Sequence, residues 1–363
     1  MRGLVKQFQG AGFFRLKSEY RAGVTDNPTF VVTIDTGHGS KSVVDYVGED
    51  VGMPASVKQL ENAIDAAAGT ELWIKGTPDA IPVLQSEHFN FDGPAGLALM
   101  TKAAERGDVE TMDRLHSLGT PTIGEPSDGP LFAAASANQV AALSWLFDHG
   151  GGNKPKVISE AFGVAVASDS DEAFDRLSSL VDPKLLTSDF ATKLLASAAR
   201  NGNVRMVSYF MRLHPRLKGS ANDRIGEEPA LWAAAQSECP KEGHHPNCDH
   251  RKVVRMLLDA GSDPSWFHPV YRNSVLFLVS DPQIARMLLA GGADPNLKDT
   301  EGEPIIFSIS DEDVGLAMID AGLDLHAVRP ADKMTLRGWA NYEKWPRVIT
   351  KLNAARVLKS HAD

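Results

Sequence analysis

Ligands suited to a metal ion are concentrated in the segment 237–250, which contains both cysteines and three of the eleven histidines. Thiolate and imidazole are the ligands that zinc prefers in proteins. The spacing Cys-x4-His-His-x2-Cys-x-His supplies enough of them for a tetrahedral site built from Cys239, His244, Cys248 and His250. A structural zinc ion is therefore the first chemistry that this segment suggests, although its spacing matches no established zinc-finger pattern.

Three other interpretations of the same segment stay open. It is a solvated loop if it is simply a length insertion, which repeat proteins tolerate. Cys239 and Cys248 form a disulfide if the protein is exported to an oxidising compartment. In the third interpretation, His245 and His250 simply cap the ends of helices.

A second candidate site is the aromatic segment 265–273, which contains Trp266, Phe267, Tyr271 and Arg272. Aromatic and arginine side chains are the usual anchors of binding hot spots. These four residues are therefore predicted to bind a partner protein. The alternative is that the segment folds back over the preceding insertion and buries its aromatic rings.

Evidence for catalysis is weak. No Ser, His and Asp motif with nucleophile-elbow context is present, and Asp26, His38 and Asp45 are the only titratable candidates near the N-terminus. The acidic clusters 169–172 and 311–313 each precede a predicted helix, where negative charge favours the helix dipole. The chain is therefore predicted not to be an enzyme.

The elements around these sites repeat with a fixed period. The segments 253–264 and 284–295 both contain a Leu-Leu helix followed by Gly and Asp-Pro, at a spacing of 31 residues. A short Ala-rich or apolar helix precedes such segments, as in 129–135, 228–235 and 302–307. A period of about thirty residues indicates a solenoid. The pattern resembles the ankyrin repeat, although the Thr-Pro-Leu-His-x-Ala motif is only partly kept.

The resemblance implies a mainly α fold: an ankyrin-like α-solenoid of about seven to eight helix pairs. Units are expected to start near residues 97, 129, 159, 191, 228, 273 and 302, with a degenerate eighth from 334 to 358. Gly107 and Gly202 are expected to end first helices, and Asp108 and Asn203 to cap the second. The segment 265–273 falls where ankyrin units project a finger-like β-turn.

The first 70 residues do not carry the repeat. A β-hairpin is predicted around 36–40, with one helix from about 54 to 68 and another around 4–14. The segments 13–16, 23–29, 41–46 and 60–65, with Tyr20, resemble a bacterial family of unknown function that is often found on exported proteins. Because that family normally has further strands before this point, the chain is expected to be truncated at its N-terminus or to have a misassigned start.

The predicted organisation is a small α+β domain at 1–70, a linker or half-repeat cap at 71–96, and the repeat solenoid at 97–358 with its insertion at 237–250. With 363 residues, 43% hydrophobic and 23% charged, the chain is predicted to be folded and soluble. No apolar run approaches the length of a membrane span. As given, the chain is expected to be cytoplasmic, but a truncated start would allow an exported parent, so localisation stays open.

A net charge of −10 and a pI near 5.6 argue against nucleic acid as a partner, because phosphate binding needs a basic surface. The resemblance implies instead a protein-protein interaction module that binds through the concave face and turn tips of its solenoid. The alternative is a metal-responsive protein whose Cys/His insertion binds zinc and orders the solenoid.

Overall fold

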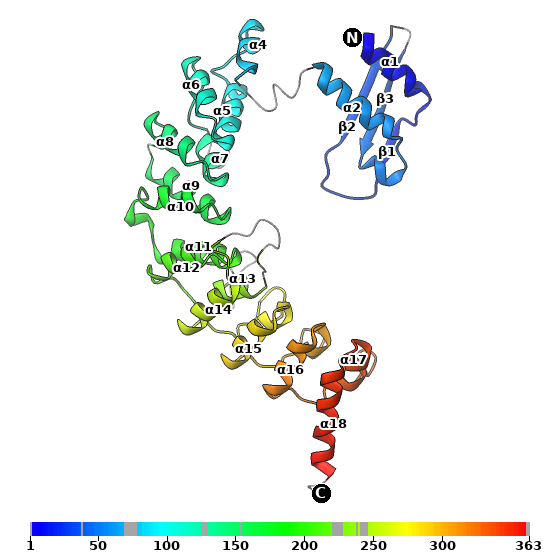
Figure 1. The fold of residues 1–363 in the computed structure, drawn as a ribbon, viewed down its shortest axis with the longest axis vertical. Coiled ribbons are helices and arrows are strands. Elements are labelled where there is room, and N and C mark those ends of the chain that lie inside the picture. The colour runs from blue at the N-terminus through cyan, green and yellow to red at the C-terminus, as the bar shows by residue number, and fades with distance from the viewer. Residues whose placement is uncertain are drawn as a thin grey trace. The chain divides into compact units, whose positions relative to one another are not determined.

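The computed structural model describes residues 2–37, 39–68, 78–124, 129–152, 154–219, 228–236, 239 and 246–360. The chain forms two compact units, Met1–Pro130 and Leu131–Asp363 (Figure 1). It is mainly helical, with a small three-stranded sheet. Among the described residues, no helix combines the length and apolar character needed to cross a bilayer. The finer domain boundaries stay predictions.

The sheet has the strand order β1-β3-β2, built from β1 (Glu19–Arg21), β2 (Phe30–Asp35) and β3 (Ser40–Tyr46). The predicted hairpin is β2–β3, whose antiparallel register places Val32 opposite Val43. Strand β1 was not predicted, and it pairs parallel to β3. A three-residue strand that pairs with a distant segment has no local periodicity by which to recognise it.

Two helices, α1 (Arg2–Gly10) and α2 (Ala55–Ala68), complete this sheet region (residues 2–68). Helix α2 was predicted almost to the residue. The predicted helix at 4–14 ends earlier, at Gly10, and a 3-10 turn, η1 (Phe13–Arg15), follows. A second 3-10 turn, η2 (Gly48–Val51), follows β3. The apolar core of the region consists of Phe8, Phe13, Tyr20, Val32, Val43, Met53, Val57 and Leu60.

The rest of the first unit contains α4 (Ala80–Ser86), α5 (Pro94–Arg106) and α6 (Val109–Ser117). Helices α5 and α6 pack against each other and are joined by a very short turn, as in a helical hairpin. As predicted, Gly107 ends α5 at a φ of 69°, and the Asp108 carboxylate accepts the Thr111 backbone N–H at 3.0 Å. Gly107 and Asp108 therefore form the predicted turn between α5 and α6.

The second unit is a series of helix pairs that follow one another in chain order (Figure 1). The pairs are α7 (Pro130–Ser136) with α8 (Val140–Asp148), α9 (Pro155–Ala167) with α10 (Asp171–Ser178), α11 (Ser188–Arg200) with α12 (Val204–Met211), α13 (Ala230–Ala235) with α14 (His250–Asp259), η4 (Val275–Leu278) with α15 (Pro282–Ala290), η5 (Ile305–Ser308) with α16 (Glu312–Asp320), and α17 (Leu336–Tyr342) with α18 (Pro346–Ser360). A short 3-10 turn, η3 (Pro183–Leu185), joins α10 to α11.

Neighbouring pairs stack through equivalent elements. Among the first elements, α9 packs on α11, α11 on α13, α13 on η4, η4 on η5, and η5 on α17. Among the second elements, α12 packs on α14, α14 on α15, and α15 on α16. Stacking of each copy on its neighbour is typical of a solenoid. The second unit is therefore a helical solenoid, and the number of repeats stays a prediction.

The first elements of two C-terminal pairs are single 3-10 turns rather than the α-helices that were predicted. Their apolar residues include β-branched Val275, Ile305 and Ile306, where the earlier copy α13 has alanines. Branching at Cβ restricts χ1 in a helix and lowers helix propensity. These side chains are nevertheless buried, so the short turns still fill the seam between pairs.

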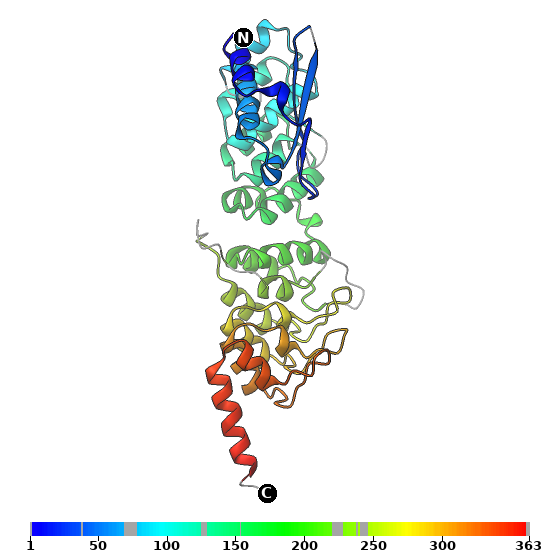
Figure 2. The ribbon, with the colours of Figure 1, turned by 90° about the vertical axis from the view of Figure 1, so that its right-hand side faces the viewer.

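Hairpin-like turns connect the last helix pairs. Backbone bridges close them at Phe267 with Ser274, Lys298 with Pro304, and Val328 with Thr335. In the edge-on view, the yellow and orange connections extend to one side of the stacked helices (Figure 2). We call the first of them, residues 263–275, the finger turn.

Candidate functional site

The two cysteines are joined by a disulfide between Cys239 and Cys248, with their Cα atoms 5.9 Å apart. The zinc site predicted from Cys239, His244, Cys248 and His250 needs thiolates, and a disulfide provides none. The structure therefore agrees with the disulfide interpretation of the insertion, and zinc binding by the reduced cysteines stays a prediction. His244 lies outside the described residues.

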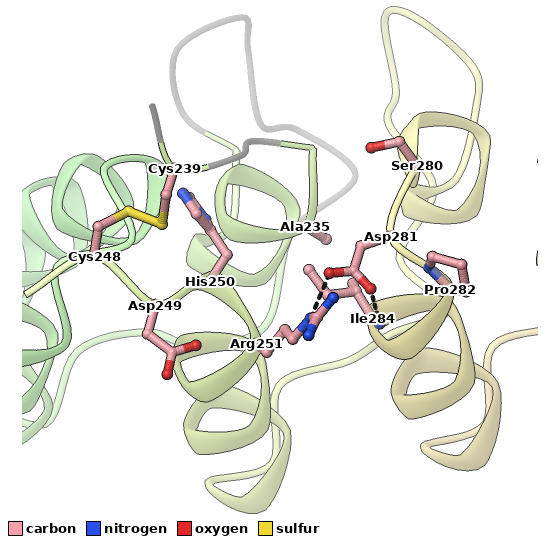
Figure 3. A pocket seen from close by; sticks show the side chains of 10 residues that line it. All are labelled: Ala235, Cys239, Cys248, Asp249, His250, Arg251, Ser280, Asp281, Pro282 and Ile284. Atoms are coloured by element: carbon pink, nitrogen blue, oxygen red, sulfur yellow. Dashed lines mark hydrogen bonds and ion pairs between the residues drawn. A yellow bond between two sulfur atoms is a disulfide. The ribbon is translucent and has the colours of Figure 1, made fainter. Parts of the chain in front are cut away.

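Three of the four predicted ligands nevertheless lie together. One ligand atom from each of Cys239, Cys248 and His250 lies within 4.8 Å of the others. In Figure 3 the imidazole ring of His250 points from the start of α14 toward the disulfide. We call these three residues the Cys/His cluster.

His250 is buried, with 6% of its surface exposed. Its Nδ1 atom lies 3.0 Å from the carbonyl oxygen of Ala234, in the last turn of α13. A carbonyl can only accept, so Nδ1 carries the proton and, in the neutral ring, Nε2 carries the lone pair. The predicted capping role of His250 is thus present, because it satisfies a carbonyl at the end of a helix.

The loop end 246–249 is fastened to the turn between α11 and α12. Backbone hydrogen bonds run from Val204 N to the Asn247 oxygen at 3.0 Å and from Asp249 N to the Gly202 oxygen at 2.9 Å. Gly202 adopts a φ of 68°, as predicted, and a Cβ there would lie 2.7 Å from His250 Nε2 and 2.9 Å from Cys248 Sγ. Only glycine therefore allows this turn to lie against the Cys/His cluster.

An open pocket of about 510 Å³ lies beside the cluster, between α14 and the start of α15 (Figure 3). At its far side the Arg251 guanidinium donates to the Asp281 carboxylate at 2.6 Å. Burial favours a higher pKa for Asp281, but the hydrogen bonds from Arg251 and from backbone N–H groups prevail and lower it. The positive charge of Arg251 is therefore paired within the fold.

The four predicted partner-binding residues divide into two groups. Trp266 and Phe267, near the base of the finger turn, are half-buried, and the Trp266 ring packs edge-on against Trp232 at 5.3 Å. Tyr271, at the tip, is 53% exposed, and Arg272 beside it is exposed with a φ of 52°. The segment thus both buries and exposes aromatic rings, and partner binding by these residues stays a prediction.

His268, which was not predicted as a site residue, holds the tip of the finger turn. It is fully buried, and its Nδ1 atom accepts the backbone N–H groups of Val270 and Tyr271, both at 3.1 Å. Its Nε2 atom lies 3.4 Å from the Glu228 carboxylate. Asp299, at the equivalent position of the next turn, accepts two backbone N–H groups in the same way. Alignment of the copies would have revealed this position.

A second exposed aromatic surface lies on α17. Tyr342 is 69% exposed and its ring stacks on Trp339, with centroids 5.5 Å apart. The Arg329 guanidinium lies over the Trp339 ring at 5.3 Å. Cation–π contact and stacking hold these side chains in one arrangement. These residues were not predicted as a site, because scattered aromatic residues usually belong to the core.

The weak catalytic candidates do not converge among the described residues. His38 lies outside them, and Asp26 occupies a turn at a φ of 62°. Asp45 is buried and accepts the Gly48 N–H at 2.8 Å. It neighbours Glu61, whose carboxylate lies 2.8 Å from the Lys58 ammonium.

Comparison with known proteins adds a family match at the N-terminus. A model described as Domain of unknown function (DUF6438) matches residues 1–68. No curated protein matches the chain significantly. Among solved structures, the chain is similar to the human ASB11 ankyrin repeat domain at a TM-score of 0.46 and 14% sequence identity, covering 61% of this chain and 96% of that one.

Proposed function

We propose that this chain is a non-enzymatic protein-recognition module, which binds a partner through the first elements and finger-like turns of its solenoid. The observation that carries the proposal is the finger turn, where a fully buried His268 positions an exposed Tyr271. A rigidly held aromatic side chain gives binding energy at low entropic cost.

The stacked architecture supports the same proposal. A solenoid presents an extended surface made of equivalent positions in successive copies, and such surfaces commonly bind other proteins. The ankyrin-like repeat pattern adds that the first elements and the turn tips line this surface. Arg272 beside Tyr271 supplies the cation that commonly accompanies aromatic anchors.

The test is affinity capture from a bacterial extract with two matched double variants. Tyr271→Ala/Arg272→Ala removes the tip, whereas Lys252→Ala/Arg255→Ala removes two large side chains from the second helix α14. Trp266 is left intact because it packs on Trp232 and its removal would disturb folding. The proposal expects a partner, identified by mass spectrometry, that the control retains and the tip variant loses. Equal retention by both variants contradicts the tip surface.

A second candidate function is metal response, in which zinc binds the insertion and orders the solenoid. The gathering of Cys239, Cys248 and His250 within 4.8 Å favours it, provided that the cysteines are reduced. Zinc added to the reduced chain should raise its melting temperature, and Cys248→Ser should remove that rise. If neither added zinc nor a chelator changes the melting temperature, the proposed metal response is contradicted.

A further inference from the structure

We infer that the Cys/His cluster is a redox-gated metal clamp, in which a disulfide and a bound zinc ion are mutually exclusive states of the same three side chains. This inference rests on the metal-responsive function proposed above and adds its regulation. Its chemical basis is that sulfur in a disulfide has no thiolate charge to offer, whereas each reduced cysteine does.

The histidine is arranged as a ligand before any metal arrives. The hydrogen bond from Nδ1 to the Ala234 oxygen selects the tautomer with its lone pair on Nε2. Histidines that bind metals commonly donate their other ring N–H to a carbonyl in this way, which fixes the ring. A Cβ built on Gly202 would lie 2.7 Å from Nε2 and 2.9 Å from Cys248 Sγ, so this nitrogen and this sulfur border the same point. The ring as a whole lies beside the disulfide (Figure 3).

Two of the three donors keep their places when the sulfur–sulfur bond breaks. Cys248 is bridged to Asn203, and the neighbouring Asp249 N–H is bonded to the Gly202 carbonyl. Asp249 also caps α14 by accepting the Lys252 N–H at 2.9 Å, which positions the helix that carries His250. None of these bonds involves a sulfur atom, so the half-site made by Cys248 and His250 does not depend on the disulfide.

The redox step needs a dithiol reductant of the thioredoxin type. Its two thiols reduce the Cys239–Cys248 bond to two cysteine thiols and leave the reductant as a disulfide, so that two electrons and two protons pass to this chain. Zinc then binds and displaces both thiol protons, while neutral His250 loses none. Three protein donors leave one position of a tetrahedral ion for water or a further side chain.

The disulfide state and the zinc-bound state have the same structural consequence, because each links the same two segments. The disulfide connects Cys239, after α13, to Cys248, before α14, and a zinc ion held by both thiolates restores that link in reducing conditions. The metal-free dithiol state lacks it. A link between Cys239 and Cys248 is therefore present in either redox environment as long as zinc is available.

Zinc binding by the full chain in both oxidation states tests the inference. Bound zinc is measured by elemental analysis after desalting, and free thiols are counted with a disulfide reagent. We expect about one zinc per reduced chain, none per oxidised chain, and release of the ion with loss of both thiols when oxidised glutathione is added. His250→Asn, which keeps a donor near the Nδ1 position, should weaken zinc affinity about tenfold or more while the disulfide still forms.

The failures are distinguishable. If neither form binds zinc, the metal-responsive function and the gate both fall. If both forms bind zinc equally, or if Cys248→Ser leaves binding unchanged, the gate is overturned while metal binding elsewhere in the chain stands. If His250→Asn binds as tightly as the native chain, the assignment of His250 as a ligand is overturned.

Discussion

The side-chain amide of Asn247 donates a hydrogen bond of 2.6 Å to Asp171, a residue 76 positions earlier in the chain. The same carboxylate accepts from Asn203 at 3.1 Å and from Arg205 at 2.6 Å. Asp171 therefore ties α10 to α12 and to the loop that carries Cys248. Through this residue the Cys/His cluster is connected to the helix pairs that precede it.

Asp171→Asn should destabilise the second unit by about 2 kcal/mol, because hydrogen bonds to a charged group are the stronger kind. Urea denaturation followed by circular dichroism measures the change. Asp148→Asn, at an exposed position of α8, is the matched control and should have little effect. Equal stability of the two variants would show that the Asp171 network contributes nothing.

The same network predicts how stability responds to acid. Burial favours a higher pKa for Asp171, but the hydrogen bonds from Arg205, Asn203 and Asn247 prevail, so its pKa is lowered below the usual 3.8. A lowered pKa contributes stability that is present above pH 3.8 and is lost as the pH falls through the folded-state value. Below pH 3.8 the native chain and Asp171→Asn should therefore converge in melting temperature, and a constant difference would contradict this.

The disulfide closes a short loop, because its two cysteines are nine positions apart in the sequence. Constraining the unfolded chain over such a loop stabilises the fold by about 2–3 kcal/mol. Calorimetry without metal should show that Cys239→Ser/Cys248→Ser melts below the native chain and that reductant removes the difference. If the variant has the same melting temperature as the oxidised native chain, the disulfide has no stabilising role.

Gly202 offers a sharp steric test. Gly202→Ala adds a Cβ at a positive φ and places it against His250 and Cys248, whereas Gly261→Ala adds one at a φ of 92° with nothing within 4 Å. Both variants should lose about 1 kcal/mol from backbone strain, and Gly202→Ala should lose roughly 1–3 kcal/mol more. Denaturant unfolding compares them, and equal losses would argue against close packing at the cluster.

Glu61 in the sheet region should oppose stability at neutral pH. Burial raises its pKa above the usual 4.5, and Asp45 adds to the rise, while Lys58 only partly offsets it. A raised pKa contributes stability below pH 4.5 that is lost as the pH rises through the folded value. Glu61→Gln should therefore slow hydrogen exchange in α2 and β3 at pH 7, but much less at pH 4, with exposed Glu49→Gln as control. Faster exchange in Glu61→Gln at pH 7 would reverse this interpretation.

Residues that form turns and helix caps explain why many of the helix pairs could be predicted. Gly107 with Asp108 and Gly202 with Asn203 mark turns through φ preference and capping, which are properties of neighbouring residues. The hairpin of β2 and β3 is local in the same sense. Strand β1 was missed because its partner β3 lies beyond any local pattern.

The candidate site could be predicted only in part, because its arrangement depends on contacts between residues that are distant in the sequence. The spacing of Cys239 and Cys248 admits a loop, a disulfide or a metal, and the choice depends on how α13 and α14 place the two cysteines. The role of Asp171 depends on its hydrogen bond with Asn247. The two residues are 76 positions apart, so no local sequence pattern relates them. Tyr271 was predicted because aromatic side chains are the usual anchors of binding hot spots. His268, which positions it, was not predicted, because the equivalent residue of the next turn is an aspartate, Asp299.

The most direct test of recognition is the dissociation constant of the captured partner, measured by calorimetry against the native chain and both double variants. We predict that Tyr271→Ala/Arg272→Ala weakens binding by about tenfold or more, since a hot-spot truncation costs over about 1–2 kcal/mol. Lys252→Ala/Arg255→Ala should leave the constant within about twofold. Unchanged affinity in the tip variant would contradict recognition through the finger turn.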